Sequence, residues 1–198
     1  MSLRSALWRC RLLVLAVSTA ALAACSGSFG DARQRLSIRG SDTMVILAQR
    51  WAEAYMATHP ETTVQVTGGG SGTGLAALIN GTTDIANASR PIHDRERRYL
   101  RRNRGAEAHE TPVALDAVAV YVHGDNPIES LTIEQLAGVF RGQIEDWSEL
   151  GEEPGPIVLY SRENNSGTYA YFKEHVLDGL DFDASAQTLP GTAAVINA

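Results

Sequence analysis

The sequence predicts an α/β protein whose mixed sheets are flanked by helices and divided between two lobes. Three observations predict this class. Segments typical of strands and of helices alternate along the first half of the chain, which favours a parallel or mixed sheet. The loops between these segments are rich in Ser, Thr and Gly. From Glu110 the pattern changes to a long β-rich run, which places a first lobe at residues 36–112 and a second at 113–198.

The first lobe is predicted to alternate short strands with helices. Apolar side chains recur at helical spacing from Met44 to Met56, and this helix is expected to end before Pro60. A shorter helix is expected to stop at Gly81, because glycine commonly follows the last turn of a helix. The predicted strands are 36–40, 62–67 and 83–89, and the predicted helices between them run through 44–56 and 75–79.

The second lobe begins with the sequence TPVALDAVAVYVHG at 111–124, which predicts a long β segment interrupted at Asp116. A helix is predicted over 130–140, with Thr132 as its N-cap. The sequence PIVLYS at 156–161 predicts a strand, and the polar turn after it leads into an amphipathic helix.

The start of the chain has the pattern of an export signal. Three arginines precede an apolar run at 12–24, which is shorter than the span of about 20 residues that a membrane helix needs. The run ends in Leu-Ala-Ala-Cys, which looks like a bacterial lipobox with Cys25 as the lipidated residue; ordinary signal cleavage near this place is the alternative. The predicted segments are a signal peptide at 1–24 and a tether at 25–35.

Charge and cysteine content limit the classes of partner. The net charge is −6, and without the three signal arginines 14 basic residues stand against 23 acidic ones, a net charge of −9. An acidic domain is a poor candidate for binding nucleic acid. Because the long-range field of an acidic domain does not attract anions, any bound anion must be held by local N–H and O–H donors.

The chain has one cysteine besides Cys25. This residue, Cys10, lies in the signal segment, so no disulfide is expected in the mature domain.

Three loops share one design, in which a strand ends and Ser, Thr or Gly residues open a helix. They are Gly40–Thr43, Gly68–Gly74 and Asn164–Thr168. A helix N-terminus carries unpaired N–H groups and partial positive charge, so each loop is a candidate anion site. Plain helix capping is the alternative for each loop. Arg162 lies four residues before Ser166 and could grip two oxygens of a small tetrahedral anion without a metal.

Competing motifs are incomplete in this sequence. The glycine-rich run lacks the Lys-Ser or Lys-Thr of a nucleotide P-loop, and Thr73 stands where a nucleophile elbow needs glycine. The five histidines show no metal-ligand spacing, so no metal and no cofactor are expected. The arginine-rich segment 95–104 is interpreted as a solvated helix face rather than a nucleic-acid or lipid patch.

Five motifs in this order resemble the periplasmic phosphate-binding proteins of Pst-type ABC importers: GSDTM, GGGSGTG, DIANASRPI, the block from PVALDAV to WSELG, and SRENNSGTYAYFKE. The resemblance runs from about Leu36 to the C-terminus. It implies a type II periplasmic-binding-protein fold that closes on one phosphate ion and is not an enzyme. It also implies a monomer outside the cytoplasm that delivers phosphate to an ABC permease and contacts the membrane only through a lipid anchor at Cys25.

Carried over motif by motif, the resemblance implies a phosphate site built from both lobes. The backbone of Arg90 and of the glycines would act together with hydroxyl groups and the guanidinium of Arg162. The expected site residues are Ser41, Thr43, Ser71, Gly72, Ser89, Arg90, Arg162, Ser166, Gly167 and Thr168.

The sequence departs from the family in two places. Some members carry an aspartate where this chain has Arg90, and that aspartate accepts the proton of the ligand and so rejects sulfate. Asp42, Asp84 and Asp116 are the alternatives for this role. Family members also continue beyond the position of Ala198 with segments that return to the first lobe, so we expect this chain to be truncated at its C-terminus.

The sequence leaves three further functions open. One is a general, sulfate-like oxyanion binder, and another is a phosphate-binding surface sensor or adhesin. The third is a serine-dependent phosphatase with Ser71 or Ser166 as nucleophile, although neither serine is accompanied by a recognisable base.

Overall fold

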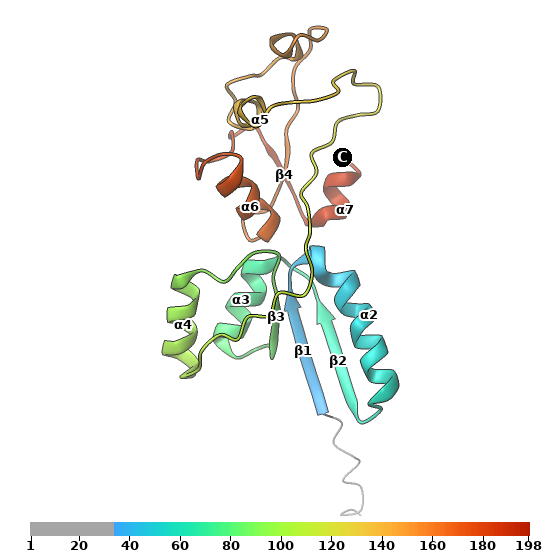
Figure 1. The fold of residues 1–198 in the computed structure, drawn as a ribbon, viewed down its shortest axis with the longest axis vertical. Coiled ribbons are helices and arrows are strands. Elements are labelled where there is room, and N and C mark those ends of the chain that lie inside the picture. Colours follow the sequence, from blue (N-terminus) through green and yellow to red (C-terminus); the bar gives the residue numbers. More distant parts are fainter. Residues whose placement is uncertain (1–33) are drawn as a thin grey trace, which may run out of the picture. The chain divides into compact units, whose positions relative to one another are not determined.

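The computed structural model describes residues 34–198, and Figure 1 shows their helices and strands in chain order. The predicted signal peptide, most of the predicted tether and the predicted lipidation site at Cys25 lie outside the described residues. Within 34–198, none of the helices combines the length and the apolar character that crossing a membrane requires.

The first sheet is formed by three strands from the first half of the chain. Its strands β1 (Gln34–Gly40), β2 (Thr62–Thr67) and β3 (Ile85–Asn87) lie in the order β2-β1-β3. Strands β1 and β3 run parallel, with Ile38 opposite Ile85 and Gly40 opposite Asn87. Their carboxyl ends are therefore level, which is the edge where open parallel sheets bind ligands. All three predicted strands are confirmed, although the third is shorter than predicted.

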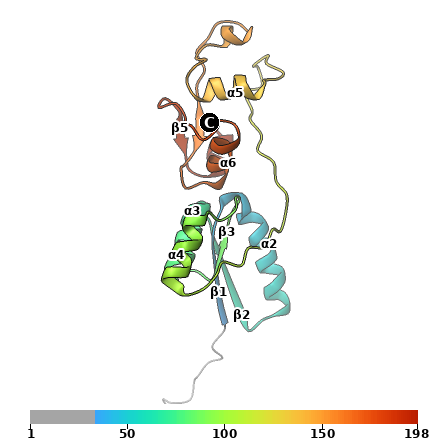
Figure 2. The same ribbon diagram turned by 60° about the vertical axis from the view of Figure 1, so that its left-hand side comes forward.

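Three helices accompany this sheet, α2 (Asp42–Thr58), α3 (Ser71–Asn80) and α4 (Asp94–Arg104). Helix α2 packs against β2, while α3 packs against both β3 and α4. Helices α3 and α4 lie side by side in both views of the ribbon (Figures 1 and 2). Small and aliphatic side chains fill these contacts: Ala48, Ala52, Leu75, Ala77 and Leu100 are buried.

One glycine sets how closely α3 approaches the sheet. A Cβ atom added to Gly74 would lie 2.3 Å from the carbonyl oxygen of Arg39 in β1. Only a residue without a side chain fits there, so the N-terminal turn of α3 can rest directly on the end of β1.

The second half of the chain forms a second, two-stranded sheet with its own core. Strands β4 (Tyr160–Arg162) and β5 (Gln187–Leu189) are parallel, with Tyr160 opposite Gln187. The aromatic rings of Phe140 and Phe172 meet edge to face, with their centroids 4.8 Å apart. The remaining elements are α5 (Ile133–Phe140), the 3-10 helix η1 (Trp147–Leu150), α6 (Gly167–His175) and α7 (Gly191–Ile196).

Thr132 is the N-cap of α5, as predicted. Its hydroxyl accepts a hydrogen bond from the backbone N–H of Gln135 at 3.1 Å, and the side chain of Gln135 accepts from the N–H of Thr132 at 2.9 Å. This reciprocal pair satisfies two N–H groups of the helix start.

The predicted β segment at 111–124 is wrong. These residues form no strand in the structure, and many of their apolar side chains are exposed, among them Leu115. No strand within 34–198 pairs with them, and a strand exists only where a neighbour accepts and donates its backbone hydrogen bonds. For a related reason the strand predicted at 156–161 begins only at Tyr160, where β5 provides a partner.

The α/β class is confirmed, and both strand pairs with a defined register are parallel.

Candidate functional site

The three predicted loops follow the carboxyl ends of β1, β2 and β4 and open α2, α3 and α6. Ser41 is the N-cap of α2, but its side chain makes no capping hydrogen bond although the residue is only 2% exposed. Ser166 is the N-cap of α6, and its hydroxyl accepts from the backbone N–H of Tyr169 at 3.3 Å. Capping therefore accounts for the hydroxyl of Ser166 and leaves that of Ser41 without an explanation.

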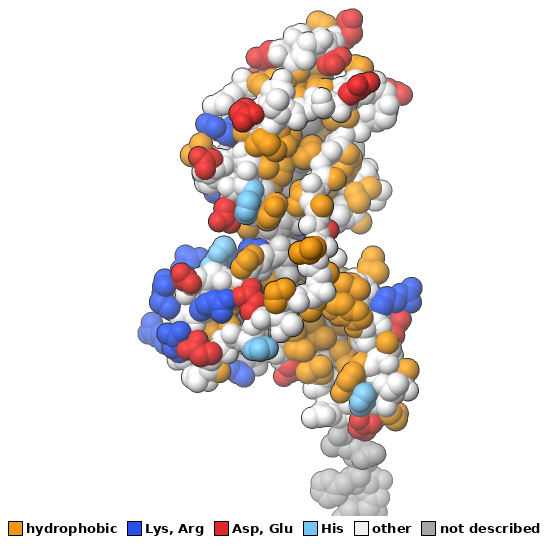
Figure 3. Space-filling model, in the orientation of Figure 1, with side chains coloured by type: hydrophobic (Ala, Val, Ile, Leu, Met, Phe, Trp, Pro, Cys, Tyr) orange, Lys and Arg blue, Asp and Glu red, His pale blue; other side chains and the backbone are white. Residues whose placement is uncertain are grey.

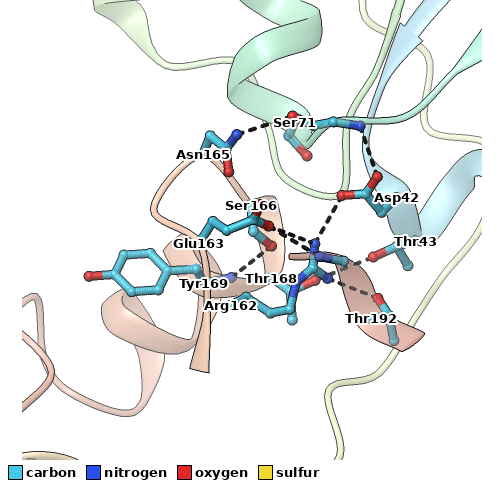
Figure 4. A network of polar contacts seen from close by, with 12 residues as sticks. Asp42, Thr43, Ser71, Arg162, Glu163, Asn165, Ser166, Thr168, Tyr169 and Thr192 are labelled. Atoms are coloured by element: carbon cyan, nitrogen blue, oxygen red, sulfur yellow. Dashed lines mark hydrogen bonds and ion pairs between the residues drawn. The ribbon is translucent and has the colours of Figure 1, made fainter. Parts of the chain in front are cut away.

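The loops meet one another although they are far apart in the sequence. The hydroxyls of Thr43 and Thr168 lie 3.3 Å apart (Figure 4). The backbone N–H of Gly72 donates to the carbonyl oxygen of Asn165 at 2.9 Å. These contacts bring polar groups of the first and second halves of the chain to one place.

A pair of serines lies at the centre of this cluster. Ser71 is fully buried, and its hydroxyl lies 3.2 Å from that of Ser89 and accepts from the N–H of Ser89 at 3.1 Å. A Cβ atom on Gly167 would lie 2.5 Å from the Ser71 hydroxyl and 2.4 Å from the Ser89 hydroxyl. The N-terminus of α6 thus lies directly against both serines. Ser89, which only the family resemblance had indicated, belongs to the same cluster.

Arg162 ends β4 and is 8% exposed. Its Nη1 donates to the hydroxyl of Thr192 at 2.8 Å, and its Nη2 donates to Oδ2 of Asp42 at 3.0 Å (Figure 4). The other oxygen of Asp42 accepts from the N–H of Gly69 at 2.8 Å. Asp42 therefore connects the arginine to the glycine-rich loop.

Unsatisfied polar atoms are concentrated in this region. Among the described residues, the buried side-chain nitrogens and oxygens without a hydrogen-bond partner are Nε of Arg162, Nδ2 of Asn87 and Oδ1 of Asn165. Asn87 adjoins Ser41, whose N–H donates to the Asn87 carbonyl at 2.9 Å. Buried polar atoms without partners are rare and cost free energy, so three in one region indicate a place that binds a ligand.

Arg90 is engaged differently from the other predicted residues. Its guanidinium donates to both carboxylate oxygens of Glu96, at 2.9 and 2.8 Å. Burial raises the pKa of Glu96, but the hydrogen bonds from Arg90 and from the backbone of His93 outweigh burial and hold that pKa below its ordinary value of 4.5. The side chain of Arg90 thus anchors the start of α4, and only its backbone remains a candidate for the site.

Arg90 precedes α4, whose own arginines are mostly exposed. Basic side chains gather at the left of the lower part of Figure 3, where Figure 1 shows α4. Two of them, Arg97 and Arg101, pair with Glu110 and Glu107.

The structure distinguishes the three aspartates that the sequence left as alternatives for accepting the proton of the ligand. Asp84 accepts from the backbone N–H of Ser37 at 2.8 Å, and Asp116 accepts from the neighbouring N–H of Ala117 at 2.8 Å. Asp42 alone of the three contacts Arg162. No group of three or more His, Cys, Asp and Glu side chains within 34–198 is arranged to hold a metal ion.

Sequence reasoning gave Asn165 no role of its own and did not identify Asn87 or Thr192 as parts of this region. Asn165 belongs to the turn that was singled out, yet nothing in its spacing distinguishes it from Asn164. Thr192 follows β5, and only the pairing of β5 with β4 brings it to Arg162.

Comparison with known proteins agrees with this architecture. The family described as the PBP superfamily domain matches residues 27–197. The phosphate-binding protein PstS of Pseudomonas aeruginosa is 36% identical over 173 residues, covering 81% of this chain and 54% of that protein. PstS of Staphylococcus saprophyticus is 32% identical over 170 residues, covering 82% of this chain and 53% of that protein. The chain thus spans about half the length of these curated relatives.

Two crystal structures share the fold. A candidate phosphate ABC transporter substrate-binding protein with bound phosphate, from Clostridium perfringens, has a TM-score of 0.74 at 29% identity; the match covers 83% of this chain and 65% of that one. An ABC-type phosphate transport receptor from Vibrio cholerae has a TM-score of 0.64 at 32% identity, covering 81% of this chain and 64% of that one. The chain therefore belongs to the PBP superfamily and, within it, groups with the Pst-type phosphate-binding proteins, as the sequence motifs predicted.

Proposed function

We propose that this protein binds inorganic phosphate at the cluster around Arg162 and delivers it to the permease of an ABC transporter. The observation that carries the proposal is the buried guanidinium of Arg162, whose Nε has no partner, beside hydroxyls and helix N-termini from both halves of the chain. The names of the relatives support phosphate as the anion.

Each group has a role that follows from its chemistry. Arg162 supplies positive charge and fixed N–H donors, which suit two oxygens of one anion. The hydroxyls of Ser41, Thr43 and Thr168 add donors that can rotate to meet the anion. The N-termini of α2, α3 and α6 add partial positive charge, and the proposed backbone donors are those of Arg90, Gly167 and their neighbours.

The number of donors is sufficient for tight binding without a metal. A hydrogen bond to a charged group contributes about 1.5–3 kcal/mol net. Micromolar affinity corresponds to about 8 kcal/mol, so about three to five such bonds reach it.

Asp42 gives the site a means of selecting a protonated anion. Its carboxylate lies 3.0 Å from Arg162, so an anion held by that arginine also meets the carboxylate. HPO₄²⁻ carries a proton that a carboxylate can accept, whereas sulfate carries none at neutral pH and would be repelled. We assign to Asp42 the role that an aspartate at the position of Arg90 has in some family members.

The setting of the protein belongs to the same proposal. We assign one lobe to residues 36–112 and a second to 113–198, and these lobes would close on the anion. The protein would act as a monomer. Lipidation of Cys25 after removal of residues 1–24 would hold the protein at the outer face of the membrane, close to its permease. The start of the sequence supports this anchor through its arginines, its apolar run and the residues before Cys25.

Isothermal titration calorimetry of the purified protein, with its fold checked by circular dichroism, tests the function. Phosphate is expected to bind with micromolar or tighter affinity, and sulfate at least tenfold more weakly. Equal affinities would support the general oxyanion binder, which the replacement of the family's aspartate by Arg90 favours. A folded protein that binds neither anion would refute the proposal.

A further inference from the structure

Asn165 makes three hydrogen bonds to the first half of the chain, more than the other residues of its turn. Its side-chain Nδ2 donates to the carbonyl oxygen of Gly69 at 3.1 Å and to the hydroxyl of Thr73 at 3.2 Å. Its own carbonyl oxygen accepts from the N–H of Gly72 at 2.9 Å. Three hydrogen bonds of one residue thus fasten the turn before α6 to the glycine-rich loop. Figure 4 shows the Asn165 side chain directed at this loop.

The glycine-rich loop is shaped to receive this residue. A Cβ atom on Gly70 would lie 2.7 Å from the Asn165 carbonyl oxygen, and Gly70 has a φ of +85°, which disfavours other residues. A Cβ atom on Gly72 would lie 3.3 Å from the same oxygen. The close approach of the two backbones therefore depends on missing side chains at these positions.

The same contact uses a donor that the family resemblance assigned to the anion. Because the N–H of Gly72 already donates to Asn165, this N–H holds the two loops together in the structure. The Ser71 hydroxyl and Gly167, both predicted site members, lie within the region that this contact closes.

We infer that Asn165 is a positioning residue that latches the Arg162–Thr168 turn to the Gly68–Gly74 loop and thereby sets how long the anion stays bound. The inference rests on the proposed function. An anion held by donors on both loops can leave only after the loops separate, and separation breaks the bonds of Asn165. Encounter with the anion takes place before the loops join, so association does not depend on these bonds.

The adjacent asparagine provides a matched control. Asn164 is exposed, whereas Asn165 is half-buried against the loop. The substitutions Asn165→Ala and Asn164→Ala remove the same side chain one residue apart. Asn165→Asp and Asn164→Asp introduce the same charge, and the first of these also replaces the donor that faces Gly69 by an acceptor of the same size.

The experiment measures the rate at which radiolabelled phosphate dissociates during a chase with excess unlabelled phosphate. Calorimetry gives the dissociation constant. The association rate constant is the dissociation rate constant divided by the dissociation constant. In Asn165→Ala we expect the dissociation rate to rise about tenfold or more, since two hydrogen bonds are lost, with the association rate within about twofold of wild type. Asn165→Asp should dissociate at least as fast. Both Asn164 variants should match wild type.

The outcomes separate this inference from the function on which it rests. If wild type fails to bind phosphate, both are overturned. If wild type binds and Asn165→Ala or Asn165→Asp keeps the wild-type dissociation rate, the latch is wrong while the phosphate site stands. A loss confined to the association rate would also contradict the latch. Melting temperatures of all four variants show whether a change in rate reflects unfolding.

Discussion

The proposed anion site is expected to depend most on Arg162, whose guanidinium is buried and keeps one N–H without a partner. Substitution of Arg162 by Met keeps much of the buried volume and removes the charge. We expect phosphate affinity to fall at least a hundredfold, about 3 kcal/mol, because two charge-assisted hydrogen bonds are lost. Calorimetry measures the change.

Arg50→Met is the control for this substitution. Arg50 pairs with Glu53 on the exposed surface of α2, where its side chain is 76% exposed. Its loss should leave phosphate affinity unchanged. Similar losses in the two variants would indicate a general effect of net charge rather than a site at Arg162.

Asp42 is expected to control selectivity between phosphate and sulfate. In Asp42→Asn the repulsion between the carboxylate and a fully ionised anion disappears, while the acceptor for a ligand proton becomes weaker. The ratio of sulfate to phosphate dissociation constants is therefore expected to fall by about tenfold or more, which corresponds to about 1.4 kcal/mol. Competition of the two anions in calorimetry gives this ratio.

Asp84→Asn is the matched control, since Asp84 accepts a backbone N–H within the first sheet and does not contact Arg162. Selectivity that survives in Asp42→Asn, or that is lost equally in both variants, would contradict the role of Asp42.

Residue types in a motif predicted which side chains gather, but not which of them pair. The turn at 162–168 and the loops Gly40–Thr43 and Gly68–Gly74 were found from the sequence because helix N-termini have a local signature. The ion pair of Arg162 with Asp42 joins residues 120 positions apart. Local pattern contains no information on such a pair, so Asp42 remained one of three alternatives until the fold placed it.

At the scale of elements, the packing of α3 on the first sheet depends on Gly74. Gly74→Ala would place a methyl group 2.3 Å from a backbone oxygen of β1. Because that oxygen is part of the backbone, the clash is relieved only if α3 moves away from the sheet. We expect a loss of about 2 kcal/mol or more in the free energy of unfolding, seen as a melting temperature lower by several degrees. Gly124→Ala is the control, because nothing lies within 4 Å of its added methyl group. Equal melting temperatures for the two variants would contradict this packing.

The start of α4 gives a prediction that depends on pH. Glu96 has its pKa lowered in the folded protein by Arg90 and by the backbone of His93, against the opposing effect of burial. A carboxylate with a lowered folded pKa stabilises the protein above its unfolded pKa, and this contribution is lost as pH falls through the folded pKa. Wild type should therefore lose stability below about pH 4.5, and Glu96→Gln should lose less over the same range.

At pH 7 Glu96→Gln should already be less stable than wild type, by about 1–3 kcal/mol, because Arg90 loses a charged partner. Glu107→Gln, which breaks an exposed pair with Arg101, should leave the melting temperature unchanged at both pH values. Thermal unfolding followed by circular dichroism from pH 3 to pH 7 gives these values; parallel acid profiles for wild type and Glu96→Gln would contradict the prediction.

Elements with local signals were predictable and those that need distant partners were not. Strand β2 was predicted at its observed bounds, and the N-cap at Thr132 was found from residue type alone. The run at 111–124 has the composition of a strand, but alternation shows only which side chains would share a face. Whether a neighbouring strand exists is decided by the rest of the fold, and within 34–198 this run has none.

At the scale of the whole molecule, the candidate site is assembled from segments that the sequence keeps apart. The loops after β1, β2 and β3 come from the first sheet, and the turn after β4 and Thr192 come from the second. Neither sheet alone provides both the arginine and the Ser71–Ser89 pair. Anion binding and the joining of the two parts of the chain are thus expected to be coupled.

This coupling predicts that phosphate stabilises both parts of the chain together. Phosphate at about 100 times its dissociation constant should stabilise the protein by about 2.7 kcal/mol, raising the melting temperature by about 5–10 °C. In hydrogen exchange, the amides of Gly40–Thr43, Gly68–Gly74 and Asn164–Thr168 should all become protected together, because separation of the loops exposes all three. Amides of the exposed segment 111–124 should exchange at the same rate with and without phosphate. Protection of one loop without the others would mean that the anion is held by a single helix N-terminus, and the assembly of the site from both parts of the chain would then be wrong.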